Sequence, residues 1–93
     1  MEIIVHRINK IQELKTINPI YGVEIDLRSY GNELILNHEP STKGDKFEDF
    51  LKKYRHGTLV LNIKESGIES TAIALIQKYN TVKNYFLLDV EFP

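Results

Sequence analysis

The chain has 93 residues, of which 42 % are hydrophobic and 27 % charged, the usual composition of a single globular domain. A formal net charge of −1 gives no general attraction to nucleic acid or to an anionic membrane, so any anion-binding site must be local. The absence of cysteine excludes a disulfide scaffold and a thiolate metal site. No apolar run approaches the ~18 residues of a membrane span, and the N-terminus lacks a secretory signal pattern, so a cytoplasmic location without membrane insertion is expected.

Along the chain, short apolar runs alternate with amphipathic segments. Apolar, β-branched or alternating runs predict strands over 2–7, 21–29, 58–64 and 84–92, with an extended return over 33–39 after turn residues at 30–32. Helical spacing predicts helices over 9–17, 46–57 and 66–80. We expect Asn9 and Ser66 to open the first and third helices, and Gly57 to follow the end of the second.

Strands separated by helices favour parallel pairing through right-handed crossovers. The order therefore predicts an α/β fold, a parallel (β/α) half-barrel resembling the first four strands of a TIM barrel, with a β-hairpin-like return after the second strand. Residues 1–93 would form a single domain, half of a (β/α)8 barrel, which typically takes ~250 residues. Such a sheet leaves two edges unpaired. Three arrangements stay open: a homodimer that completes the barrel, a piece of a longer protein, or an open sheet.

Polar side chains gather at the predicted carboxyl ends of the strands. Glu24 and Asp26 share one face of the second strand, and a turn centred near Gly31 would bring His38 level with Glu24. The first and third strands end in further polar residues, namely His6, Arg7, Asn62 and Lys64. Because the carboxyl ends of parallel strands meet at one edge of a sheet, we expect a site there.

The segments "HR", "VEIDLR", "LNHEP" and "LNIK" resemble motifs of the glycerophosphodiester phosphodiesterase family, and more broadly the phospholipase-C-like phosphodiesterase barrels. The resemblance covers the whole chain but only the first half of that family's barrel. Its most specific element is Glu24-x-Asp26 followed by His38. It implies a divalent cation (Mg²⁺ or Ca²⁺) on Glu24, Asp26 and Asn62, acid–base catalysis by His6 and His38, and phosphate contacts from Arg7 and Lys64.

The activity implied by the resemblance is metal-dependent hydrolysis of a small-molecule, glycerophosphodiester-like substrate. The chain departs from the family pattern at Ile8, where the family has Gly, at Glu39, where it has Asp, and at Asn62, where it has a metal-binding carboxylate. These departures keep a second interpretation open, a catalytically inactive half-barrel that binds a phosphate-bearing ligand or assembles with another chain.

Simpler interpretations compete for several of these residues. Glu24, Asp26 and Arg28 would also suit the solvated face of an amphipathic ribbon. His56 is expected at a helix C-terminus, where the dipole favours it, and has no assigned chemistry. Asp89 and Glu91, on the last predicted strand, are expected near the same edge of the sheet as the candidate site.

Overall fold

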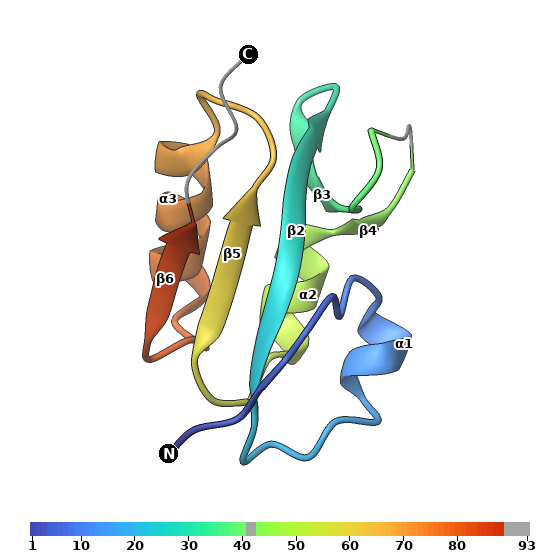
Figure 1. Ribbon diagram of the computed structural model, residues 1–93. Helices are drawn as coiled ribbons and strands as arrows, with labels where there is room; N and C mark the ends of the chain where they lie inside the picture. The colour runs from blue at the N-terminus through green and yellow to red at the C-terminus, as the bar shows by residue number, and fades with distance from the viewer. Residues whose placement is uncertain (41–42, 89–93) are drawn as a thin grey trace.

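The computed structural model describes residues 1–40 and 43–88, which form a mixed α/β domain (Figure 1). Within these residues the strands are β1 (Ile4–Val5), β2 (Gly22–Tyr30), β3 (Glu33–Leu36), β4 (Asp45–Lys46), β5 (Leu59–Ile63) and β6 (Tyr85–Leu88). The helices are short, namely α1 (Ile11–Leu14), α2 (Phe47–Lys53) and α3 (Glu69–Tyr79).

One sheet in the order β4-β3-β2-β5-β6 contains these strands, with β1 alongside β2. The pairings β1–β2, β2–β5 and β5–β6 are parallel, whereas β2–β3 and β3–β4 are antiparallel. The predicted parallel half-barrel is therefore wrong, because the sheet is mixed. The physical reason lies in the return after β2, which forms a full antiparallel ladder and is extended by β4 before the chain enters α2.

The two faces of the sheet follow the alternation in β2. Val23, Ile25 and Leu27 are fully buried in the main core, together with Leu59 and Leu61 of β5. Helices α2 and α3 lie over one face of the sheet (Figure 1). The even-numbered residues of β2 point to the other face, and there the polar side chains gather.

The helices are shorter than the sequence predicts. Helix α1 begins after Lys10, so Asn9 is not its N-cap. Helix α2 ends at Lys53, before Gly57, and α3 begins after Ile68 rather than Ser66. The last strand is described to Leu88, so Asp89 and Glu91 lie outside the described residues. In the part of the chain that the structure describes, no helix has the length and apolar character needed to cross a membrane.

Candidate functional site

Asp26 is the centre of a polar cluster on the face of the sheet away from the main core. Its side chain is 1 % exposed, although a carboxylate is costly to bury without partners. Asn9 Nδ2 donates to Oδ2 at 3.0 Å, and Asn62 Nδ2 donates to Oδ1 at 3.2 Å. Lys64 Nζ lies 3.7 Å from Oδ1. Both oxygens of the buried carboxylate are thus occupied by nitrogen donors, and a cation offsets its charge.

The parallel register of β2 and β5 brings these side chains together. Asp26 pairs with Asn62, so both point to the same face of the sheet. Lys64 lies two residues farther along, and its N–H donates to the Leu27 carbonyl at 3.1 Å, which keeps the chain beside β2. The sequence predicts these side chains at the carboxyl ends of the strands, but Asp26 lies in the middle of β2, while Asn62 and Lys64 lie at the end of β5.

His6 and Glu24 form a second contact at the same face. The pairing of Val5 with Val23 places the next residues of β1 and β2 side by side, and the Ile8 N–H continues the ladder to the Glu24 carbonyl at 2.9 Å. His6 Nδ1 lies 3.4 Å from Glu24 Oε1. The imidazole is 78 % exposed and the carboxylate side chain 15 % exposed, so the ring faces solvent while the carboxylate is partly enclosed.

Arg7, which follows His6, has an unusual backbone. Its φ of 54° lies in the left-handed region, which costs a non-glycine residue about 1–2 kcal/mol. The residue is exposed, and its guanidinium has no ion-pair partner in 1–40 or 43–88. Strain of this kind is concentrated at functional sites, which makes Arg7 a candidate ligand contact.

The position of His38 differs from the sequence prediction by one residue. Leu27 pairs with Leu36, so the turn is centred on Gly31–Asn32 rather than on Gly31 alone. If this register is extended, Glu39 rather than His38 lies level with Glu24. In an extended chain, a shift of one residue moves a side chain to the opposite face.

The contacts of His38 lie in the segment that follows β3. Its Nδ1 is 3.2 Å from Glu39 Oε1, and its carbonyl accepts a hydrogen bond from Arg28 Nη2 at 2.7 Å. Neither contact involves Glu24 or Asp26. The structure therefore brings His6 to Glu24 and both Asn62 and Lys64 to Asp26, whereas His38 has other partners.

Asn9 is the site residue that the sequence did not predict. Besides donating to the Asp26 carboxylate, its Oδ1 accepts the Asp26 backbone N–H at 2.8 Å, so one amide satisfies two groups of the same residue. Asparagine before an apolar periodic segment is typical of a helix N-cap. The residues around Asn9 carry no signal for this alternative, because the partner lies 17 positions away.

The residues present do not fit a tightly held divalent cation. Mg²⁺ and Ca²⁺ need several oxygen ligands around one accessible position, whereas the Asp26 carboxylate is 1 % exposed and accepts hydrogen bonds from Asn9 and Asn62. Lys64 lies within ion-pair distance of the same carboxylate. Among the described residues, no group of three or more His, Cys, Asp or Glu side chains is arranged to hold a metal ion.

No family model, curated protein or solved structure matches this chain. The resemblance to glycerophosphodiester phosphodiesterases consequently stays a prediction from the motifs. Any function must be argued from the geometry of the cluster formed by His6, Arg7, Asn9, Glu24, Asp26, Asn62 and Lys64, which we call the Asp26 site.

Proposed function

We propose that the Asp26 site binds a monoanionic phosphodiester without a tightly held metal ion. The observation that carries this proposal is the occupied Asp26 carboxylate, whose charge is offset by Lys64 at 3.7 Å. In a phosphodiester site that relies on a metal, the cation would occupy such a carboxylate. Here a lysine takes that role, and an anion can approach without a divalent ion.

The balance of charges at the site favours a single negative charge on the ligand. Lys64 is balanced by Asp26, and His6, when protonated, is balanced by Glu24 at 3.4 Å. Arg7 is then the cation left without a carboxylate partner among the described residues. Its guanidinium fork matches two oxygens of one phosphate group, and a phosphodiester carries one charge.

Titration with glycerophosphoglycerol, a monoanionic glycerophosphodiester, tests the proposal. In the presence of a chelator, we expect the amide signals of residues 6–9 and 62–64 to shift together in NMR spectra. Arg7→Gln should weaken binding about tenfold, because it removes a charged hydrogen-bond donor. Lys83→Gln, an exposed lysine outside the site, is the matched control and should bind as the unmodified chain does.

Arg7→Gly separates ligand binding from folding. Glycine adopts a positive φ without steric cost, so this variant should gain stability, by about 1 kcal/mol, while it loses binding. Binding that appears only when Mg²⁺ or Ca²⁺ is added, or that survives both Arg7 substitutions, would contradict the proposal.

The contact between His6 and Glu24 favours a second candidate function, hydrolysis of the bound phosphodiester. A carboxylate beside a ring nitrogen orients the imidazole, as acid–base catalysis requires. His6 would accept the proton of the attacking water as the new P–O bond forms. It would then return that proton to the leaving alkoxide as the ester P–O bond breaks.

Turnover of bis(4-nitrophenyl) phosphate, measured with and without Mg²⁺ or Ca²⁺, distinguishes the two functions. Hydrolysis that falls by about 10²-fold or more in both His6→Ala and Glu24→Gln supports catalysis at this contact. His38→Ala is the control, and we expect it to retain the activity. If no turnover is measured without metal, with Mg²⁺ or with Ca²⁺, phosphodiester binding is left as the function.

A further inference from the structure

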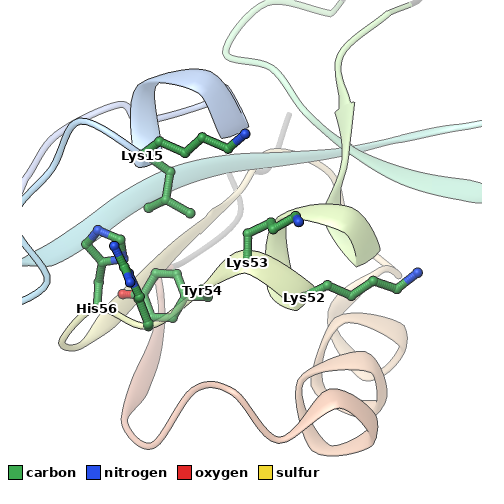
Figure 2. A pocket seen from close by; sticks show the side chains of 7 residues that line it. Lys15, Lys52, Lys53, Tyr54 and His56 are labelled. Atoms are coloured by element: carbon green, nitrogen blue, oxygen red, sulfur yellow. The ribbon is translucent and has the colours of Figure 1, made fainter.

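A second concave site is formed by residues outside the Asp26 site. It is a cavity of about 350 Å³ between the end of α1 and the segment that leads from α2 into β5 (Figure 2). Its lining consists of Leu14, Lys15, Lys52, Lys53, Tyr54, Arg55 and His56. The segment 54–56 precedes the amino end of β5, whereas Asn62 and Lys64 lie at its carboxyl end, so the two sites do not share residues.

The lining is strongly basic although the chain has a net charge of −1. Lys52 already has partners, with Asp49 Oδ1 at 3.8 Å and the Tyr79 ring centroid at 5.6 Å. No carboxylate in the part of the chain that the structure describes lies within ion-pair distance of Lys15, Lys53 or Arg55. Three like charges around one cavity repel one another, and an anion between them would relieve that repulsion.

The helix dipole explains only part of this arrangement. Basic residues are favoured in the last turn of a helix, and Lys52 and Lys53 hold that position in α2. Arg55 lies beyond the end of α2, and Lys15 comes from the end of α1 (Figure 2). Two separate elements thus contribute cations to the same cavity.

His56, a residue of the lining, is fixed by a hydrogen bond to the backbone. Its Nε2 lies 2.8 Å from the Ile17 carbonyl oxygen, which can only accept, so Nε2 carries a proton. Its Nδ1 is buried and has no hydrogen-bond partner among the described residues. With that proton on Nε2, Nδ1 is an acceptor and offers an anion no hydrogen bond, so attraction of an anion to the cavity comes from the cations.

The aromatic part of the cavity is held firmly in place. The Tyr54 ring centroid is 5.4 Å from that of His56 and 5.7 Å from that of Phe50. The Tyr54 hydroxyl donates to the Gly57 carbonyl at 2.6 Å. Leu14 and the Tyr54 ring give one side of the cavity an apolar surface beside the three cations.

We propose that this cavity binds the diphosphate group of a small molecule. A diphosphate carries about three negative charges near neutral pH, which matches the three cations Lys15, Lys53 and Arg55. A volume of about 350 Å³ exceeds what an inorganic diphosphate fills and lies within the range of small-molecule pockets. An organic group attached to the diphosphate would contact the apolar side formed by Leu14 and Tyr54.

Calorimetric titrations of the 93-residue chain with ADP, inorganic pyrophosphate and AMP, at low salt and with a chelator, test this inference. ADP and pyrophosphate should bind at one site, and AMP should bind at least about tenfold more weakly, since it lacks the second phosphate. Tighter binding of ADP than of pyrophosphate identifies an organic diphosphate, whereas equal binding identifies the inorganic ion. In NMR spectra, the signals of residue 15 and of 53–56 should shift.

Paired variants separate this site from general electrostatic attraction. Lys53→Gln/Arg55→Gln should weaken ADP binding at least about tenfold, while Lys10→Gln/Lys83→Gln, which changes the net charge equally, should retain it. Equal weakening in both double variants would overturn the proposal. So would the absence of binding at millimolar ligand, or adsorption to phosphatidylglycerol vesicles without binding to ADP or pyrophosphate. Arg7→Gln should leave ADP binding unchanged. Loss of ADP binding at this cavity can therefore be distinguished from loss of phosphodiester binding at the Asp26 site.

Discussion

Asp26 shows how one buried residue organises its surroundings. A carboxylate that is 1 % exposed is stable only if donors and a countercharge replace the lost water. Asn9, Asn62 and Lys64 supply them at distances of 3.0, 3.2 and 3.7 Å. Because Asn9 also accepts the Asp26 backbone N–H, it fixes both the side chain and the backbone of this residue.

Asn9→Ala tests the importance of this amide for stability. It removes one partner of the Asp26 carboxylate and leaves the Asp26 N–H without its acceptor, so we expect the free energy of unfolding to fall by about 2–3 kcal/mol. Urea denaturation followed by circular dichroism measures the change. Gln12→Ala, on the exposed side of α1, is the control and should change stability by less than about 0.5 kcal/mol. A loss that small in Asn9→Ala would mean that water replaces the amide.

At the scale of elements, β2 is the central strand of the sheet. One of its edges pairs with β5 over five residues, from Val23 to Leu27. The other edge is divided, because β1 pairs with Gly22 and Val23, and β3 pairs with residues from Leu27 to Tyr30. Parallel and antiparallel neighbours therefore meet along one edge of a single strand, and the Asp26 site lies between them.

Gly22→Ala tests how closely the elements approach at the start of β2. A methyl group there would lie 2.6 Å from the Thr58 carbonyl oxygen and would collide with the Ile4 side chain. That carbonyl accepts the Val23 N–H at 2.9 Å, so the shift needed would disturb the first bond between β2 and β5. We expect a loss of about 1–3 kcal/mol in the free energy of unfolding, measured by thermal or urea denaturation.

Gly31→Ala provides the comparison for this prediction. Gly31 has a φ of 62°, and no atom lies within 4 Å of an added methyl group, so its substitution costs backbone strain alone. We expect about 1 kcal/mol from that strain. If Gly22→Ala were the less destabilising of the two, close approach of the strands would not be the reason for glycine at position 22.

The sequence predicts the faces of the strands better than their pairing. Alternation over 21–29 correctly places Glu24 and Asp26 on one side of β2 and the apolar residues on the other, because side-chain direction is a local property. Pairing direction is not local: β3 pairs antiparallel with β2, and two residues, Asp45 and Lys46, form β4 and extend that antiparallel side of the sheet. No periodicity can be read from so short a segment.

The misplaced residues have equally specific causes. "YGN" indicates a turn but does not say which residues are its centre, and that choice decides the face on which His38 lies. Asn9 fits the local sequence pattern of a helix N-cap. In the structure, however, its side chain bonds the carboxylate and the backbone N–H of Asp26, and Lys10 is the N-cap. The cavity beside His56 depends on how α1 and α2 pack, which the separate helical patterns do not determine.

At the scale of the whole molecule, two carboxylates connect distant parts of the chain. Glu2 accepts hydrogen bonds from the backbone N–H and the hydroxyl of Thr58 at 2.7 and 2.5 Å, which joins the N-terminus to the start of β5. Glu48 of α2 accepts the hydroxyl of Tyr79, at the end of α3, at 2.5 Å. Hydrogen bonds from Thr58 lower the pKa of Glu2, and the bond from Tyr79 lowers that of Glu48.

These lowered pKa values predict acid sensitivity. A carboxyl group whose pKa is lower in the folded chain stabilises it fully above the ordinary value of 4.5 and loses that contribution as pH falls through the folded pKa. The urea midpoint should therefore decrease as the pH falls below 4.5. Glu2→Gln should reduce that decrease, whereas Glu13→Gln, an exposed residue of α1, should not. An unchanged acid profile in Glu2→Gln would show that Thr58 does not hold the carboxylate in solution.

Lys64 has a consequence for how the Asp26 site would respond to its surroundings. A covalently attached ammonium group is present in every copy of the protein at a ratio of one, whereas a bound metal ion is present only when the solution supplies it. The countercharge of Asp26 is thus fixed when the polypeptide is made. Under the proposed function, removal of Mg²⁺ or Ca²⁺ from the solution should leave ligand binding unchanged.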